Sequence, residues 1–395
     1  MKKQMALWLA VLLLLTGCKG GRSATKDTEI DLYRGRADTG VWITYSELNG
    51  MISSEKGFQA EWEQVIERCR ALRLGEIYLH VRSHCDAIYP SALFPMNRSA
   101  GSLDFDLLAT ILESCHQAGI ALHAWINPYR VKTGDSDPET LDPASPAYLW
   151  LHDSDKTNDR NVCFSGGIYL NPGEPEVQEL VIGGVRELLQ HYAVDGIHFD
   201  DYFYPTTDPA FDRESYKAYC AAANEPLSLA EWRRANVNAL IAGCYAAIHA
   251  TDRETVFSVS PAASIERNRE ELYADQAEWV ANGTVDVLIP QLYFGFEYPD
   301  RDFQFETLLD KWKKLTAQNP AVQLKIGLAC YKLGTDAEYD APEWQTGEDI
   351  IARETEICIR DGAAAGVLFF SYSSLFADDE IHQKQRDHLQ AVLRD

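Results

Sequence analysis

Polar side chains recur at intervals of two residues where the apolar segments of this chain end. Side chains alternate along a β-strand, so positions two residues apart share one face of a sheet. The positions on such shared faces are His80 and Arg82; His123, Trp125 and Asn127; His198, Asp200 and Tyr202; Gln291 and Tyr293; and Tyr331. Buried polar groups are costly unless they have partners or a use. The set therefore predicts a functional site, and a satisfied hydrogen-bond network is the structural alternative for any single member.

Asp200 and Asp201 are the pair with the most direct chemistry. Asp200 shares parity with His198 and is expected to point into the site, while Asp201 is expected beside it or in the next loop. A carboxylate there could act as a nucleophile, as a base or as a stabiliser of a positively charged sugar transition state. Arg82 or His198 would keep Asp200 ionised. Asp201 also has a structural reading, because an Asp before a loop often accepts hydrogen bonds from backbone amides.

Glycosidic hydrolysis normally needs a second carboxyl group on the other side of the scissile bond. Our candidates, in order, are Glu297 after the sixth apolar segment, Glu266 after the fifth, and Asp201. Glu47 after the first segment is a distant fourth.

Aromatic residues concentrate around the same positions. Flat rings with polar tips suit stacking on sugar faces and hydrogen bonding to hydroxyls, although many also serve as packing. These aromatics are Trp42, Trp125, Tyr129, Tyr202, Phe203, Tyr204, Tyr293, Phe294, Phe296 and Tyr298. Together with the carboxylates, they favour a carbohydrate ligand over a small charged metabolite.

Eight short apolar segments must position these groups, and helical periodicity lies between them. The expected strands are Val41–Tyr45, Glu76–Arg82, Ile120–Asn127, Gly196–Tyr202, Thr255–Ser260, Asp286–Tyr293, Leu324–Tyr331 and Gly366–Tyr372. Helices are expected over the apolar stripes at 62–72, 107–115 and 177–189, and over Leu229–Ala250, Glu270–Asn282, Glu306–Leu315, Asp349–Asp361 and Asp379–Leu393. Alternating strands and helices imply parallel pairing through right-handed crossovers.

Eight such units predict a (β/α)8 TIM barrel as one α/β domain over 33–395, with the site at the C-terminal ends of the strands. A doubly wound open sheet is the alternative, but no GxGxxG or GxxxxGK[ST] follows any strand. The stretches Val131–Ile168 and Pro205–Leu227 predict enlarged loops after strands three and four. Val131–Ile168 shows little periodicity and is rich in Asp, Pro and Ser.

The N-terminus resembles a bacterial lipoprotein signal. Residues 1–17 contain two lysines, an apolar run and small residues, and Leu15-Thr16-Gly17-Cys18 matches the lipobox pattern. We therefore expect cleavage before Cys18, lipidation of that cysteine, and a flexible tether over 18–32. An ordinary signal peptide is the alternative. The predicted location is the bacterial cell envelope, with the domain held outside the cytoplasm by a lipid anchor in the membrane.

Charge and cysteine spacing exclude several other classes. The chain has 395 residues with 36 Lys+Arg against 60 Asp+Glu, a formal charge of -24 that disfavours nucleic-acid partners. The cysteines form no CxxC pair, so neither a zinc cluster nor a thioredoxin-like motif is indicated. No cofactor or metal is expected.

The ordered segments WITYSELN, YLHVRSHCDAIYPS, LHAWINPYRV, YLNPGEPEV, VDGIHFDDYFYP, WRRANVN, YADQAEWV and IPQLYF resemble the glycosyl-hydrolase-like family 10 proteins. The resemblance covers about 33–375 and implies a (β/α)8 barrel that hydrolyses glycosidic bonds, with peptidoglycan-type glycan strands as a substrate. It implies catalysis at Asp200 and Asp201. It also implies substrate contacts from Arg82, Asp86, Asn127, Arg130, Gln291 and Tyr293.

Two segments depart from the family pattern, and two other functions stay open. Tyr293-Phe294 stands where relatives often have Tyr-Trp, and SPAASIERN follows strand five where relatives often carry a glycine-aromatic version. One alternative is a glycan-binding lipoprotein without activity. The other is a metal-dependent hydrolase that uses His80, His123, His198 and Asp200, although strand one lacks the HxH of such barrels.

Overall fold

The computed structural model of the chain describes residues 38–394, except 53, 252–253, 336–341 and 361. The expected signal segment, Cys18 and the tether lie outside these residues. No helix in the described part is long and apolar enough to cross a bilayer.

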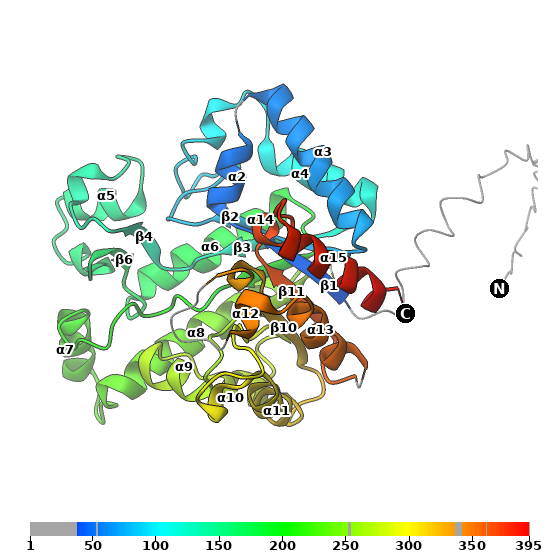
Figure 1. Cartoon of the computed structure of the whole chain (residues 1–395). Coiled ribbons are helices and arrows are strands. Elements are labelled where there is room, and N and C mark those ends of the chain that lie inside the picture. The colour runs from blue at the N-terminus through cyan, green and yellow to red at the C-terminus, as the bar shows by residue number, and fades with distance from the viewer. Residues whose placement is uncertain (1–37, 53, 252–253, 336–341, 361, 395) are drawn as a thin grey trace, which may run out of the picture. The chain divides into compact units, whose positions relative to one another are not determined.

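Eight parallel strands close into a barrel in the spatial order β1-β11-β10-β9-β8-β7-β3-β2. Helices surround the strands (Figure 1). Their bounds are β1 Asp38–Ile43, β2 Glu76–Arg82, β3 Ala121–Ile126, β7 Gly196–Phe199, β8 Val256–Val259, β9 Val287–Leu288, β10 Gln323–Ala329 and β11 Gly366–Phe370. Each overlaps one expected strand, so the predicted (β/α)8 TIM barrel is confirmed. The strands are nearly continuously buried, as a parallel sheet covered by helices requires.

The helices that pack around the barrel bury the stripes read from the sequence. Their bounds are α2 Tyr45–Met51, α3 Glu55–Ala71, α4 Leu107–Ala118, α6 Pro175–His191, α8 Leu229–His249, α9 Ile265–Glu271, α10 Gln276–Asn282, α11 Phe305–Thr316, α12 Glu343–Thr346, α13 Ile350–Arg360, α14 Tyr372–Leu375 and α15 Glu380–Val392. In α4, for example, Leu108, Ile111 and Cys115 are fully buried, and Asp106 caps the first turn by accepting from the Ala109 N–H. Gly119 ends this helix with φ 73°.

The single helix expected over Glu270–Asn282 is wrong, because two short helices, α9 and α10, occupy this region. Ser264 caps α9 and Asp275 caps α10, each accepting from a backbone N–H three residues later. Tyr273 between them has φ 54°, which a continuous helix cannot include. The two N-cap residues therefore start two separate helices, although the apolar periodicity suggested one.

Both enlarged loops carry regular structure. The first holds α5 Pro146–His152 and an antiparallel sheet in the order β4-β6-β5, formed by Arg130–Thr133, Gly167–Leu170 and Val162–Phe164. The second holds α7 Arg213–Ala222. The loops bind each other, since Asn171 Nδ2 donates to Ser215 Oγ at 2.8 Å. Strands of three or four residues are too short for their periodicity to show in the sequence.

A buried ion pair fixes the second loop to the body of the barrel. Arg233 of α8 donates from Nε and Nη2 to the two carboxylate oxygens of Asp212 at 2.8 and 2.6 Å, and both side chains are fully buried. Nη1 of the same guanidinium donates to the Tyr273 hydroxyl at 3.0 Å. The α7 segment is thereby anchored to both α8 and the α9–α10 junction.

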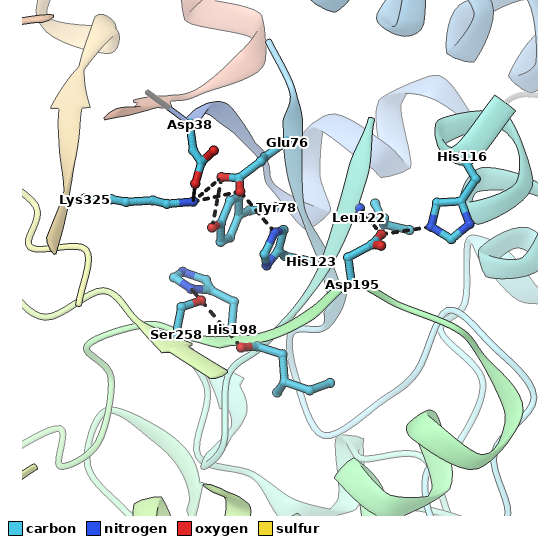
Figure 2. Close-up of polar contacts among 11 residues, drawn as sticks. Asp38, Glu76, Tyr78, His116, Leu122, His123, Asp195, His198, Ser258 and Lys325 are labelled. Carbon is cyan, nitrogen blue, oxygen red and sulfur yellow. Dashed lines mark hydrogen bonds and ion pairs between the residues drawn. The ribbon is translucent and has the colours of Figure 1, made fainter. Parts of the chain in front are cut away.

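A charge network closes the N-terminal end of the barrel (Figure 2). Lys325 Nζ donates to both carboxylate oxygens of Glu76, at 2.7 and 2.8 Å, and lies 3.0 Å from Asp38. His123 lies 3.6 Å from the same Glu76 carboxylate and stacks on Tyr78. Burial alone would raise the Glu76 pKa, but Lys325 and His123 outweigh it and lower that pKa to about 2.

Two similar contacts tie neighbouring strands at this end. Asp195 precedes β7 and accepts from the Leu122 N–H of β3 at 2.7 Å and from His116 at the end of α4 at 2.9 Å (Figure 2). Asp286 precedes β9 and receives the corresponding pair from Phe257 of β8 and His249 of α8. Glu76, Lys325, Asp195 and Asp286 at this end thus each have a structural partner within the fold.

Candidate active site

A cavity of about 430 Å³ opens at the C-terminal ends of the strands. It is lined by Trp42, Thr44, Tyr45, His80, Trp125, Arg130, Asp200, Asp201, Tyr202, Ser260, Gln291, Tyr293, Tyr331 and Phe370. Ten of these were singled out from the sequence: Trp42, His80, Trp125, Arg130, Asp200, Asp201, Tyr202, Gln291, Tyr293 and Tyr331. The structure therefore brings most of the predicted set to one pocket, at the end of the barrel where such enzymes carry out chemistry.

Asp200 is held rigidly at the end of β7. Its carboxylate accepts from Trp125 Nε1 at 3.0 Å, from Asn127 Nδ2 at 3.1 Å to both oxygens, and from the Tyr202 N–H at 3.3 Å. Burial raises the pKa of Asp200, and the charge of Arg130 and these hydrogen bonds oppose that rise. Asn127 is thus placed behind the pocket as the residue that orients Asp200.

Asp201 lies in the same pocket with fewer partners. Gln291 Nε2 donates to its Oδ1 at 3.2 Å and is itself fixed by a 2.9 Å hydrogen bond to the Ser260 carbonyl. Burial, followed by the negative charge of Asp200, raises the Asp201 pKa to about 6. One carboxyl group is therefore well supplied with donors and the other is poised to hold a proton near neutral pH.

Trp42 forms part of the pocket lining, and His198 lies behind it. Trp42 Nε1 donates to His198 Nε2 at 3.1 Å, so this nitrogen must be an acceptor. The neutral ring then carries its proton on Nδ1, which lies 2.8 Å from Ser258 Oγ. Gly327 leaves room for the indole, since a Cβ there would lie 2.9 Å from it. The fully buried His198 orients Trp42 and does not reach the pocket.

Arg82 lies outside the pocket, and so the expectation that it would stand beside Asp200 is wrong. The pairing of β2 with β3 shifts between His80 and Arg82, which breaks the alternation on which the prediction rested. The guanidinium lies 4.1 Å above the Phe94 ring, and a Cβ at Gly184 of α6 would clash with it. Arg130 supplies the positive charge near Asp200 instead.

His123 and Asp86 also lie away from the pocket. His123 belongs to the charge network at the opposite end, because it precedes Trp125 by one inward position along β3. Asp86 accepts from Asn97 Nδ2 at 2.7 Å and from the His84 N–H at 3.1 Å, beside a separate groove of about 380 Å³. Its contacts are those of a loop-ordering carboxylate.

The structure does not bring Glu297 to Asp200. Glu297 is exposed, and its backbone N–H donates to Glu343 of α12 at 2.9 Å, which holds the loop after β9 away from the cavity. Glu266 is exposed on α9, and Glu47 accepts from Ser371 and Ser373. Among the candidates for a second carboxyl group, Asp201 alone lines the pocket with Asp200.

The prediction missed Thr44, Tyr45, Ser260 and Phe370 as lining residues. Ser260 shares parity with Ser258 on the fifth strand, so a signal was present but small hydroxyls are common anywhere. Phe370 and Tyr45 read as ordinary aromatics of strand ends, and only the closed barrel places them at the cavity.

The metal-site hypothesis needs His80, His123, His198 and Asp200 to converge, and they do not. His198 contacts Trp42 and Ser258, His123 contacts Glu76, and Asp200 accepts only from nitrogen donors. Over residues 38–394, outside the stated gaps, no group of three or more His, Cys, Asp or Glu side chains has a metal-binding arrangement.

Comparison with known proteins places this site in a family. The family description glycosyl hydrolase-like 10 matches residues 39–346. The chain belongs to the glycosyl hydrolase-like 10 family. The match spans the barrel from β1 to α12 and includes every residue of the pocket except Phe370.

Two curated relatives are 28% identical to the glycosyl hydrolase-like 10 chain. The glycosyl hydrolase YngK of Bacillus subtilis matches over 344 residues, 80% of this chain and 64% of YngK. The glycosyl hydrolase DigH of Escherichia coli K12 matches over 361 residues, 83% of this chain and 77% of DigH. The chain thus spans just under two thirds of YngK. Both relatives are named glycosyl hydrolases.

Solved structures support the fold of this glycosyl hydrolase-like 10 chain. The PgaB (BpsB) glycoside hydrolase domain of Bordetella bronchiseptica aligns with a TM-score of 0.60 at 14% identity, covering 89% of this chain and 98% of that domain. The α-L-fucosidase isoenzyme 2 of Paenibacillus thiaminolyticus aligns with a TM-score of 0.55 at 15% identity, covering 90% of this chain and 49% of the fucosidase.

Proposed function

We propose that this protein hydrolyses glycosidic bonds in a polysaccharide of the bacterial cell envelope, with peptidoglycan-type glycan strands as the substrate class. The observation that carries the proposal is the pairing of Asp200 and Asp201 in one aromatic-lined pocket, where burial raises the pKa of both and Asp200 receives more hydrogen bonds than Asp201. Acid-assisted cleavage of an acetal uses one protonated and one ionised carboxyl group.

Asp201 is the proposed general acid. Its pKa of about 6 keeps a large fraction protonated in mildly acidic medium, and Gln291 holds one oxygen so that the other can face the substrate. It gives its proton to the glycosidic oxygen as the bond from that oxygen to the anomeric carbon breaks.

Asp200 is the proposed ionised partner. Its hydrogen bonds from Trp125, Asn127 and the Tyr202 N–H favour the anion and fix its position. The anion stabilises the positive charge that develops at the anomeric carbon. Water then adds its hydroxyl to that carbon, and its remaining proton restores a carboxylic acid in the pocket.

The pocket walls suit a sugar. Trp42, Tyr45 and Tyr293 present aromatic surface next to the two carboxyl groups, and the two tyrosines add hydroxyl groups, whereas the Trp42 N–H is donated to His198. Stacking on sugar faces and hydrogen bonding to hydroxyls are the usual uses of such side chains. These aromatic side chains can bind a sugar without adding further carboxyl groups to the pocket.

The envelope location rests on the N-terminal sequence. Lipidation at Cys18, after removal of 1–17, would anchor the barrel to the membrane through the 18–32 tether, on the side away from the cytoplasm. Metabolic labelling with a clickable fatty acid tests this, and a Cys18→Ser variant should lose both the label and the membrane fraction.

The activity is tested by incubating the purified full chain in mild detergent with peptide-free wall glycan and a polysaccharide panel, then sizing the products. We expect cleavage of at least one glycan and a fall in kcat as the pH rises past about 6, since the general acid must be protonated. Asp201→Asn should abolish this fall in kcat with rising pH together with most of the activity.

Glu297→Gln is the matched control, because it neutralises an exposed carboxylate of a nearby loop outside the pocket. It should retain the activity and pH profile of the parent chain. Binding of glycans without cleavage by the unmodified chain would contradict the proposal and identify a glycan-binding lipoprotein.

A further inference from the structure

We infer that Glu47 is a positioning residue that holds the first and last strands of the barrel together at the pocket and so fixes its aromatic wall. This wall is formed by Trp42, Tyr293, Tyr331 and Phe370. The inference rests on the proposed function and deepens it, because the aromatic wall is where the sugar is proposed to stack. Glu47 itself takes no part in the acid and base steps.

The backbone pairing between β1 and β11 stops before the pocket is reached. Its last pair is Val41 with Phe369. The segments that follow carry Thr44 on one side and Phe370 on the other, and both residues line the pocket. The β1–β11 ladder by itself therefore does not fix how these two segments lie relative to each other.

Glu47 bridges the two segments with both oxygens of its carboxylate. Oε2 accepts from the Thr44 N–H at 2.7 Å and from Thr44 Oγ1 at 2.8 Å, as part of the capping box of α2. Oε1 accepts from Ser371 Oγ at 2.6 Å and from the Ser373 N–H at 2.7 Å. Hydrogen bonds to an ionised acceptor are short and strong, so one carboxylate holds both segments at a set distance. We call these four contacts the Glu47 clamp.

The segment after β11 depends on Glu47 for the cap of its own helix. The Ser373 N–H lies in the first turn of α14, where backbone donors have no acceptor within the helix. Ser371 is the N-cap of α14, but its hydroxyl donates to Glu47 and makes no capping hydrogen bond to α14. Glu47 therefore caps two helices, its own and that of the last strand. Ser371 and Ser373 follow residue 346, where the family match ends, so the clamp does not follow from family membership.

Phe370 connects the Glu47 clamp to the aromatic wall. It directly precedes Ser371, which is buried. Its ring lies edge to face with Trp42 and with Tyr331, each at 6.0 Å between ring centroids, and stacks with Tyr293 at 5.7 Å. Because this one ring contacts the other three members of the wall, a displacement of the end of β11 would move the surface on which the sugar is proposed to stack.

The test is Glu47→Gln, because an amide has only one oxygen. That oxygen can accept from Thr44 or from Ser373, and the NH2 group then faces a donor on the other side. We expect the KM for peptide-free wall glycan to rise about 10-fold, with kcat and its fall above about pH 6 unchanged, since the ground state and the transition state lose the same binding. An unchanged KM would overturn the inference. So would a fall in kcat with a changed pH profile, because Glu47 would then act in the chemistry.

Glu231→Gln is the matched control. Glu231 forms the same capping box in α8, but one oxygen accepts both from the Ser228 N–H at 3.1 Å and from Ser228 Oγ at 2.6 Å, and an amide can supply that oxygen. Its KM should equal that of the parent chain. Ser371→Ala removes one donor of the Glu47 clamp and should raise KM about 3-fold, which covers the case in which Glu47→Gln folds poorly. An unchanged KM in Ser371→Ala would also overturn the inference.

Hydrogen–deuterium exchange of the full chain separates this inference from the proposed function, because it needs no substrate. In Glu47→Gln, the amide of Thr44 or that of Ser373 should exchange about 10-fold faster than in the parent chain, and both should keep the parent rate in Glu231→Gln. Faster exchange supports the Glu47 clamp even if the parent chain cleaves no glycan, in which case the proposed function alone fails. Unchanged exchange at both amides overturns the clamp whatever the activity.

Discussion

Glu76 and Asp201 are carboxylates enclosed by the same barrel, one at the N-terminal end of β2 and the other after the C-terminal end of β7. Glu76 has Lys325 at 2.7 Å, and its pKa falls to about 2. Asp201 has an amide donor and a second carboxylate for neighbours, and its pKa rises to about 6. Burial acts in the same direction on both, so the partner decides the sign of the shift.

An apolar layer separates the two ends. Trp42, Tyr78, Trp125, Val287, Ile289 and Leu368 form a cluster of their own inside the barrel. Along β2 the inward side chains run Glu76, Tyr78, His80 from one end to the other. The end of the barrel at the N-termini of the strands holds paired charges that stabilise the fold. The end at the C-termini holds carboxyl groups without a protein cation in contact, and such groups are available to a ligand.

The largest effect that tests this contrast is the loss of activity in Asp200→Asn. The substitution keeps the shape of the side chain but removes the anion, so kcat should fall by about 10³-fold or more. The melting temperature should stay equal or rise, because a buried charge without an ion pair is removed. Full activity in this variant, measured as glycan cleavage, would contradict the assignment of the mouth as the catalytic end.

Lys325→Met should show the opposite pattern. Glu76 would be left as an uncompensated carboxylate, and the free energy of unfolding should fall by about 3–5 kcal/mol in a denaturant titration. The double variant Lys325→Met/Glu76→Gln should recover much of that loss, since no charge is then stranded. Activity per folded molecule should stay close to that of the parent chain; a selective loss of kcat would show that the two ends are coupled.

The two carboxylates should also respond to pH with opposite signs. The folded pKa of Glu76 lies below its unfolded value near 4.5, so its stabilising contribution is complete above that pH and is lost towards pH 2. The folded pKa of Asp201 lies above its unfolded value near 3.8, so the stability it confers is lost as pH rises through 6.

Asp201→Asn should therefore be more stable than the parent chain above pH 6, by up to about 3 kcal/mol, and equally stable below about pH 4. Glu76→Gln should be less stable than the parent at pH 7, with the difference shrinking towards pH 2. Denaturant midpoints from pH 3 to 8 measure both trends. If the stability differences of the two variants from the parent chain changed with pH in the same way, the contrast between Glu76 and Asp201 would be contradicted.

The smallest expected effect concerns the layer between the ends. His198→Phe removes the acceptor for the Trp42 indole, which lines the pocket. If Trp42 binds the sugar as proposed, KM should rise by about 10-fold with kcat changed little. His198→Gln retains an acceptor and should recover most of the affinity. A fall in kcat at constant KM would instead place His198 in the chemistry.

The sequence determined the elements and the end of the barrel that carries the site. Eight apolar segments and the stripes between them are short-range patterns, and each strand and most helices lie where those patterns indicate. The parity of His80, Trp125, Asp200, Gln291 and Tyr293 was enough to place them in one cavity, because alternation is a local property of a strand.

Only the tertiary structure decided which polar residues contact one another. Arg82 lies outside the pocket because a shift in the β2–β3 register changed the face of the strand on which it lies. Glu297 lies outside the pocket because Glu343 holds its loop. Arg130 replaced Arg82 as the cation near Asp200, and His123 joined Lys325 and Glu76 at the far end. These outcomes depend on contacts between residues far apart in the chain, and alternation along a single strand carries no information about such partners.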